Sequence, residues 1–339
     1  MPVVKVVILN WNGRAHLERF LPSVVENTPE GVDIILADNG STDDSLGWLA
    51  SNYPMVRIIR LDRNYGYAGG YNRALADESL SDADYFILLN SDVRTPADWC
   101  EPLVGLLESG RDIAAAMPKI LSYNDNGRFE YAGACGGFID GLGYPFCRGR
   151  ILSCVEKDEG QYDDRRDVFW ASGACFAVRA SVWRESGGFD EDFFAHMEEI
   201  DLCWRLQAAG FRVAVEPASR VYHLGAGTLA ANNPRKTYLN FRNNLAMLYK
   251  NLSRRSLFWV LSARLLLDGL AALGYLFTFR GEFFKAVLRA HIDFWKWRPR
   301  LKEKRKIILQ SRIAKPRNIY RGSIVLRYIF GRRKFGRLL

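Results

Sequence analysis

The stretch Tyr85–Asp92, which reads YFILLNSD, decides the fold class of this 339-residue chain. A run of apolar residues with no polar alternation predicts a strand that is buried on both faces, as in a parallel sheet. Asn90, Ser91 and Asp92 follow directly at the end of this strand. In open α/β sheets, ligands bind at the carboxyl ends of the strands. We therefore expect these three residues at a binding site, although the same residue types also form ordinary turns.

Three more runs rich in β-branched residues come earlier in the chain, and each leads through a polar or glycine-rich loop into a helical pattern. The predicted strands cover residues 3–9, 33–37 and 56–61, and the predicted helices cover residues 15–26, 46–52 and 72–78. This alternation predicts a doubly wound, mostly parallel sheet that binds a nucleotide at its carboxyl edge. The expected fold is therefore α/β and Rossmann-like, with helices flanking the sheet.

Further polar clusters follow other strands. They are Asp38, the group Asn64 with Gly69, Gly70 and Asn72, the acidic helix start with Glu198, Glu199 and Asp201, and His223. A nucleotide diphosphate with a divalent cation would suit this set. A carboxylate accepts from a pyrimidine N–H, glycines let the backbone approach a phosphate, and a hard cation binds carboxylate and phosphate oxygens. An imidazole ligand favours Mn²⁺ over Mg²⁺.

The chain resembles the family 2 nucleotide-sugar glycosyltransferases of the GT-A fold, and among these the rhamnosyltransferase-like bacterial members. The resemblance covers residues 3–250 and rests on five motifs in a fixed order. They are DNGSTDDS (38–45), NYGYAGGYN (64–72), NSD (90–92), GGFD (187–190) and EEIDL (198–202).

The resemblance implies a role for each of the clustered residues. The nucleotide would contact Asn10, Asp38, Asn64, Gly69, Gly70, Asn72, Asn90 and Ser91. Asp92 occupies the last position of the family's DxD motif and would bind Mn²⁺ or Mg²⁺, with His223 completing the metal shell. The first acid of that motif is Asn90 here, which leaves the metal fewer anionic ligands.

The acidic helix would supply the catalytic base. The family usually has Glu-Asp at this position with the second acid as base, so Glu199 inherits that role in the pair Glu198-Glu199. Glu198 and Asp201 would support the structure or the acceptor. The implied reaction is inverting transfer of a sugar from a UDP- or dTDP-linked donor, such as a rhamnose donor, to a hydroxyl of a lipid-linked or growing saccharide. Such a reaction belongs to cell-surface polysaccharide biosynthesis.

Structural roles compete with these functional ones. Ser41 or Asp43 is expected to cap a helix, as are Asp190 and Asp192. A lone histidine such as His223 is commonly an ordinary core or surface residue.

The C-terminal third has a different character, and most of the net charge of +9 comes from Lys and Arg after residue 280. The apolar run Leu257–Phe279 contains Arg264 and Asp268, which lie one helical turn apart and can pair. Because charges are costly inside a bilayer, we expect an interfacial or packed helix rather than a span. The aromatic pairs Phe283-Phe284 and Trp295/Trp297 lie among basic residues, a pattern that favours an anionic membrane surface.

We therefore expect a catalytic domain over residues 1–236 and a helical basic region over residues 237–339, peripheral on the cytosolic face of the inner membrane. No export signal precedes the first predicted strand. A nucleic-acid-binding protein that uses the basic tail is the alternative, but no recognition motif supports it, and we expect no nucleic-acid partner. A nucleotidyltransferase is disfavoured because no Gly-rich, Lys/Arg-containing loop follows the first strand.

Overall fold

The computed structural model describes residues 2–225 and 233–338. Its centre is a sheet in the order β11-β13-β6-β12-β4-β1-β2-β3, with β5 paired to β13. The strands of this sheet are β1 (Val4–Asn10), β2 (Asp33–Asp38), β3 (Arg57–Arg60), β4 (Tyr85–Asn90), β5 (Val93–Arg94), β6 (Ile113–Ser122), β11 (Arg166–Asp167), β12 (Cys175–Arg179) and β13 (Arg212–His223). The predicted α/β class is confirmed, and the first four strands fall where the apolar runs place them.

The sheet is more mixed than we expected. The neighbours β3, β2, β1 and β4 run parallel, but β12 is antiparallel to both β4 and β6. The chain between β6 and β12 contains no crossover helix. It forms a second sheet and then returns in the opposite direction, and antiparallel pairing permits such a return.

A long strand ends beside the polar residues that follow β4. This strand is β13, which runs from Arg212 to His223. A register irregularity lies between Glu216 and Arg220, and the strand continues until His223 pairs with Val93 of β5. This pairing places His223 next to the residues that follow β4.

The second sheet contains the part of the chain for which we expected irregular hairpins, residues 121–167. Its order is β10-β9-β8-β7-β14. Its strands are β7 (Gly137–Asp140), β8 (Pro145–Cys147), β9 (Arg150–Ile151), β10 (Cys154–Val155) and β14 (Ile319–Tyr320). The last strand comes from the C-terminal region and pairs in parallel with β7. Residues after position 236 are therefore part of this sheet.

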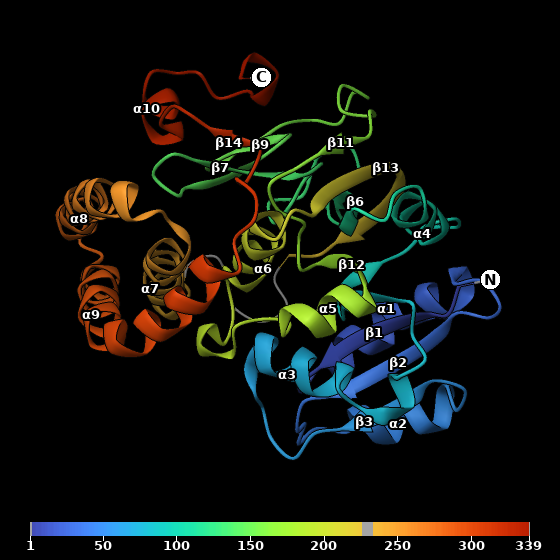
Figure 1. Ribbon diagram of the computed structural model, residues 1–339. Helices are drawn as coiled ribbons and strands as arrows, with labels where there is room; N and C mark the ends of the chain where they lie inside the picture. The colour runs from blue at the N-terminus through green and yellow to red at the C-terminus, as the bar shows by residue number, and fades with distance from the viewer. Residues whose placement is uncertain (1, 226–232, 339) are drawn as a thin grey trace.

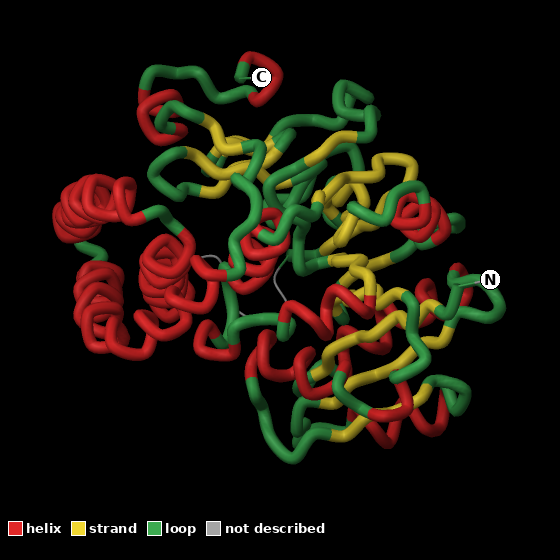
Figure 2. The backbone as a smooth tube through the Cα atoms, in the orientation of Figure 1, coloured by secondary structure: helices red, strands yellow, loops and turns green. Residues whose placement is uncertain are grey.

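Helices flank the large sheet, and three long helices gather on one side of the molecule (Figures 1 and 2). The flanking helices are α1 (Arg14–Asn27), α2 (Ser45–Asn52), α3 (Gly66–Leu75), α4 (Glu101–Glu108), α5 (Ala180–Ser186) and α6 (Glu198–Ala208). The C-terminal helices are α7 (Pro234–Asn251), α8 (Arg254–Phe277), α9 (Gly281–Gln310) and α10 (Ile324–Ile329). Short 3-10 turns lie at η1 (Glu78–Leu80), η2 (Glu191–Phe193) and η3 (Phe335–Arg337).

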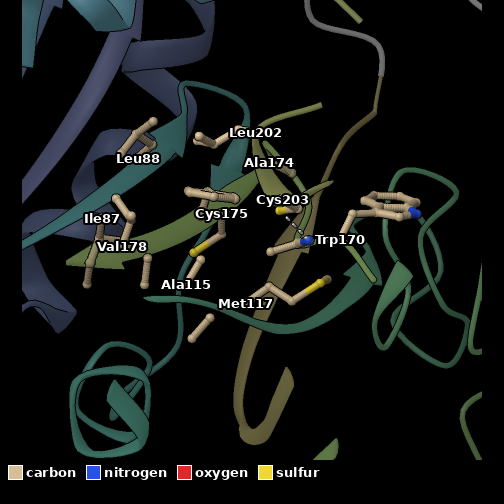
Figure 3. Close-up of a cluster of buried hydrophobic side chains, with 14 of the residues drawn as sticks. Ile87, Leu88, Ala115, Met117, Trp170, Ala174, Cys175, Val178, Leu202 and Cys203 are labelled. Atoms are coloured by element: carbon tan, nitrogen blue, oxygen red, sulfur yellow. Dashed lines mark hydrogen bonds between the residues drawn. The ribbon is translucent and has the colours of Figure 1, made fainter. Parts of the chain in front are cut away.

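The hydrophobic core holds α6 against the middle of the sheet. Figure 3 shows Leu202 and Cys203 of α6 beside Cys175 of β12 and Leu88 of β4. All four residues are buried, and the Cys203 sulfur accepts a hydrogen bond from the backbone amide of Ala171 at 3.5 Å. The start of α6 therefore has a rigid support.

The helix α8 turns its charged residues inward. Arg264 and Asp268 are buried and paired at 3.1 Å, whereas the large apolar residues of α8 are largely exposed. Those exposed by 40% or more are Phe258, Trp259, Leu265, Leu266, Leu270, Leu273, Leu276 and Phe277. By length and composition alone, α8 could cross a membrane. Its buried ion pair instead matches the expectation of a helix packed on the protein.

Lys250 of α7 joins three segments and gives a stability test. Its ammonium group is buried and pairs with Asp201 of α6 at 3.0 Å and with Asp190 of the preceding loop. Lys250→Met leaves two buried carboxylates without this partner, so we expect unfolding free energy to fall by about 3–5 kcal/mol. Urea unfolding followed by circular dichroism measures this change.

The matched control is Lys285→Met, because Lys285 pairs with Glu282 where both side chains are more than 70% exposed. Its expected cost is below about 1 kcal/mol. Equal effects of the two substitutions would contradict the anchoring role of Lys250.

Candidate active site

The ends of β1 and β2 form a buried polar corner. Asn10 pairs in register with Asp38, and its Nδ2 donates to Asp38 Oδ1 and to Ser41 Oγ, each at 3.1 Å. Asp38 Oδ2 accepts from the backbone amide of Ser41 at 3.1 Å. Asn10 Oδ1 is buried and has no hydrogen-bond partner in the part of the chain that the structure describes. Because buried polar atoms are normally paired, this oxygen is a candidate acceptor for a ligand N–H.

The loop after this corner is stabilised internally. Asn64 Oδ1 accepts from the amide of Gly66 at 2.8 Å and from Asn39 Nδ2 at 3.2 Å. Gly66 has a φ of +73°, which glycine adopts readily. Asp43 Oδ1 accepts from the amide of Ser45, the first residue of α2, at 3.1 Å. The N-cap residue of α2 is Asp44, whose side chain makes no capping hydrogen bond, so Asp43 stabilises the loop before α2 and the capping expected of Ser41 or Asp43 is not observed at this helix.

The glycines after Asn64 pack the helix against the sheet. We expected a glycine loop facing the ligand with a helix beginning at Asn72, but α3 begins at Gly66 and includes both Gly69 and Gly70. Both are buried, and a Cβ at Gly70 would lie 2.8 Å from Leu9. Close packing is one reason for glycine at both positions, and their contact with a ligand stays a prediction.

Asn72 holds the GGFD motif. Its Nδ2 donates to the carbonyl oxygen of Phe189 at 2.8 Å, and its Oδ1 accepts from the amide of Phe189 at 2.9 Å. This pair of bonds connects α3 to the loop before α6. Asn72 therefore has a structural role, and its contact with a nucleotide stays a prediction.

A carboxylate–imidazole cluster follows β4. Asp92 Oδ1 lies 3.1 Å from His223 Nε2, and Glu130 Oε2 lies 3.3 Å from His223 Nδ1. All three residues are buried. Burial alone would lower the pKa of His223, but the two carboxylates raise it to about 10. Burial opposes ionisation of Asp92, but His223 outweighs it and lowers the pKa of Asp92.

Asn90 and Ser91 border this cluster. Asn90 Nδ2 lies 3.4 Å from His223 Nε2. The Ser91 hydroxyl makes no hydrogen bond within the described residues, although it lies in the strand-end turn between Asn90 and Asp92. Leu9 of β1 pairs with Asn90 of β4. The polar corner at the ends of β1 and β2 is therefore adjacent to the Asp92 cluster.

The Asp92–His223 contact at 3.1 Å is an ion pair, and a cation that binds here would displace a proton of His223, because histidine binds a metal only in its neutral form. Two ligands at right angles around a metal with bonds of about 2.1 Å have donor atoms about 3 Å apart, close to the observed 3.1 Å. Among the described residues, no set of three or more His, Cys, Asp or Glu side chains is arranged to hold a metal ion. Any cation here therefore needs other oxygen ligands, such as those of a diphosphate.

The start of α6 presents two adjacent carboxyl groups. Glu198 Oε2 and Glu199 Oε2 are buried and have no hydrogen-bond partner in the described chain. Burial raises the pKa of Glu199 to about 7. Burial, followed by repulsion from Glu199, raises the pKa of Glu198 well above its usual value. A pKa of about 7 lets Glu199 act as a proton acceptor near neutral pH.

The backbone before α6 is strained. Phe194, His196 and Met197 have φ values of 65°, 71° and 73°, a left-handed region that costs non-glycine residues of order 1–3 kcal/mol each. Such strain persists where the surroundings impose it, and it is frequent at functional sites. The turn Phe193–Met197 therefore fixes where Glu198 and Glu199 point.

Asp201 supports this helix and does not face the site. It is fully buried and accepts from Asn251 at 2.7 Å, from Lys250 at 3.0 Å and from Arg205 at 3.0 Å. Of its two expected roles, the structural one accounts for these contacts. Asp190 likewise accepts from the amide of Asp192, as capping predicted.

Sequence reasoning missed Glu130 and Asn243. Glu130 lies in the aperiodic stretch between β6 and β7, where no pattern singled it out. Asn243 belongs to the triplet Arg242-Asn243-Asn244, which was noted only as a helix start. Each of these three polar residues is buried within α7.

Two family models match the chain. The model described as "Glycosyl transferase family 2" matches residues 5–184, and "Glycosyltransferase like family 2" matches residues 155–246. The first match covers more than half of the chain and includes Asp38 and Asp92. The chain belongs to glycosyltransferase family 2, and its activity is that of a glycosyltransferase.

The curated relatives include rhamnosyltransferases. The N-acetylglucosaminyl-diphospho-decaprenol L-rhamnosyltransferase of Mycobacterium tuberculosis is 33% identical over 234 residues, which cover 65% of this chain and 76% of the relative. Rhamnosyltransferase WbbL of Escherichia coli is 26% identical over 263 residues, covering 75% of this chain and 94% of WbbL. The predicted rhamnosyltransferase-like membership is confirmed.

Solved structures share the fold. GalNAc-T7 with UDP, GalNAc and Mn²⁺ has a TM-score of 0.57 at 17% identity, over 74% of this chain and 48% of GalNAc-T7. The mannosyltransferase PcManGT of Pyrobaculum calidifontis, with GDP-Man and Mn²⁺, has a TM-score of 0.53 at 12% identity, over 87% of both chains. The predicted GT-A fold is confirmed.

The pKa of Glu199 gives a testable pH dependence. A general base must be deprotonated, so kcat/KM should rise as the pH increases through about 7. Glu199→Gln should lower kcat by about 10²–10⁴-fold and remove this acidic limb. Both effects are measured by the initial rate of nucleoside diphosphate release, followed over roughly two pH units on either side of 7.

Glu185→Gln, at an exposed position of α5, is the matched control and should behave like the wild type. An acidic limb that persists unchanged in Glu199→Gln would show that another group is the base.

Proposed function

We propose that the protein moves a sugar, such as rhamnose, from a dTDP- or UDP-linked donor to a hydroxyl of a lipid-linked or growing saccharide, with inversion at the anomeric carbon. The observation that carries this proposal is Glu199, whose Oε2 is buried without a hydrogen-bond partner in the described chain and whose pKa is raised to about 7, together with the Asp92–His223 pair that follows β4. The names of the curated relatives support a rhamnosyl donor and a diphospho-prenol acceptor.

The base and the leaving group have separate positions. Glu199 accepts the proton of the acceptor hydroxyl as its oxygen attacks the anomeric carbon. The bond between that carbon and the diphosphate oxygen breaks, and the nucleoside diphosphate leaves. A single displacement of this kind inverts the configuration.

The donor nucleotide would bind along the strand ends. Asn10 and Asp38 offer acceptor oxygens to a pyrimidine N–H, and Asn64, Asn90 and Ser91 lie at the neighbouring strand ends. Asp92 and His223 would hold a divalent cation, Mn²⁺ or Mg²⁺, together with diphosphate oxygens. When bound, the cation offsets the negative charge that develops on the leaving diphosphate. The Mn²⁺ in the titles of both structural neighbours supports this assignment.

A donor screen tests the proposed function. The purified chain is incubated with Mn²⁺, membranes and separate dTDP-rhamnose, UDP-sugar and GDP-mannose donors, and released nucleoside diphosphate is measured. We expect release from a dTDP- or UDP-linked donor. No release from any donor, or pyrophosphate as the product, would contradict the proposal.

Asp92→Asn tests the cation site. The substitution keeps the side-chain shape and removes the charge. Loss of even an outer-shell partner costs about 10–100-fold in metal affinity, so the Mn²⁺ concentration for half-maximal activity should rise by about 10²-fold or more. Mn²⁺ binding measured by electron paramagnetic resonance with UDP present gives an independent readout. The control is Asp98→Asn, at an exposed acid, which should change neither the Mn²⁺ concentration for half-maximal activity nor Mn²⁺ binding. If Asp92→Asn also changes neither quantity, the assignment is wrong.

We also propose that α8 attaches the enzyme to the cytosolic face of the inner membrane. Its exposed side is apolar and aromatic, whereas its charged pair faces the protein. Such a helix lies in the membrane interface. We keep the boundary at residue 236 as a division of roles: residues 1–236 carry the chemistry and residues 237–339 provide the attachment.

Flotation with vesicles tests the attachment. Phe258 and Trp259 are 68% and 73% exposed, so replacing both with Ser should reduce co-flotation with phosphatidylglycerol vesicles and leave the unfolding midpoint unchanged. Met55→Ser removes a 70% exposed apolar residue near β3 and should have no effect. Equal flotation of all three proteins would contradict a role for α8.

The basic residues do not require nucleic acid. Arg300 and Lys304 of α9 pair with Asp192, and Lys304 also pairs with Asp190. Part of the positive charge is therefore balanced inside the protein, and we propose no nucleic-acid partner.

A further inference from the structure

Asn243 of α7 holds the strained turn before the catalytic carboxyls. Its Nδ2 lies 3.0, 2.9 and 2.8 Å from the carbonyl oxygens of Phe193, Ala195 and His196. Its Oδ1 accepts from Arg242 Nε at 3.0 Å and from Nη2 at 2.9 Å, which orients the amide toward the turn. The Asn243 side chain thus contacts three carbonyl oxygens of the turn Phe193–Met197, in which three residues have a left-handed backbone.

Two further carbonyls of the turn are bound by backbone amides, that of Met197 within α6, by the amide of Asp201 at 2.9 Å, and that of Phe194 by α3. The oxygen of Phe194 accepts from the backbone amides of Tyr67 and Ala68 in α3, at 2.7 and 3.2 Å. The α3 contact fixes one side of the turn, and Asn243 fixes the other. A displacement of α7 would therefore rotate the turn and move the adjacent Glu199.

The next residue connects α7 to α8. Asn244 Oδ1 accepts a hydrogen bond from Arg264 Nη1, and Asn244 Nδ2 donates to the carbonyl oxygen of Gly143 at 2.7 Å. Arg264 also donates to the carbonyl oxygen of Leu142 at 3.2 Å and packs 4.1 Å above the Tyr144 ring. The buried side of α8 is thereby joined to α7, one residue away from Asn243.

We propose that Asn243 and Asn244 make the position of Glu199 depend on how α8 is seated, so that membrane attachment raises the rate of the chemical step. Asn243 is a positioning residue, and the Asn244–Arg264 contact transmits the seating of α8. This inference rests on the proposed function, because it takes Glu199 as the base and α8 as the membrane helix. Asn243 and Asn244 make no hydrogen bond to Asn10, Asp38 or Asp92 in the described chain.

Asn243→Asp tests the positioning role. The substitution keeps the volume but puts an oxygen against the three carbonyls of the turn. Since a displacement of about 1 Å can cost 10²-fold in rate, we expect kcat to fall by about 10²-fold while KM for dTDP-rhamnose stays near the wild-type value. Asn243→Ala provides a second variant that removes the contact without adding charge. Asn240→Ala, in the same helix, is the control, because the Asn240 side chain makes no hydrogen bond in the described chain.

The second measurement compares kcat with and without vesicles of phosphatidylethanolamine and phosphatidylglycerol, using dTDP-rhamnose and a soluble N-acetylglucosaminyl acceptor. The wild type and Asn240→Ala should be stimulated several-fold. Asn244→Ala should still float with the vesicles but lose the stimulation. Full stimulation of Asn244→Ala, or normal kcat in both Asn243 variants, would overturn the proposal. If Glu199→Gln also transfers the sugar at the wild-type rate, the proposed function itself is wrong. If Glu199→Gln is slow while both Asn243 variants have a normal kcat, only this inference is rejected.

Discussion

The turn Phe193–Met197 is the constraint on which the catalytic arrangement depends. Left-handed backbone at three non-glycine residues persists only where surrounding contacts outweigh its cost. Those contacts come from α3 on one side and from α7 on the other. Farther along, Lys250 and Asn251 hold Asp201 within α6. The catalytic helix is thus fixed at both its first turn and its middle by the same C-terminal helix.

The sequence predicted the strands well because buried strands leave an unmistakable apolar signal. Tyr85–Asn90 and the three strands beside it fall where expected, and their polar ends meet because parallel strands share an edge. Asn10, Asp38, Asn90, Asp92 and His223 could therefore be placed together from residue patterns and a family resemblance. The antiparallel insertion of β12 had no such signal, because an apolar run does not record its direction.

The glycines and Asn72 show why a local pattern does not identify the neighbour of a residue. A small residue indicates that something comes close, but not whether that neighbour is a ligand or a side chain. At Gly70 the neighbour is Leu9. Asn243 was overlooked for a related reason, since an amide in a helix gives no sign of facing three carbonyls until the packing is known. Local patterns identify strand ends, whereas contacts between distant segments decide the rest.

The strand β14 has a consequence for biosynthesis. Residues 319–320 complete a sheet whose other strands lie between residues 137 and 155, and Asp140 accepts a hydrogen bond from the amide of Ile324. Contacts between segments so far apart in sequence form late and slowly. During synthesis, α8 is therefore complete before the small sheet can close. The order of translation therefore leaves the exposed apolar side of α8 available while the small sheet is still incomplete.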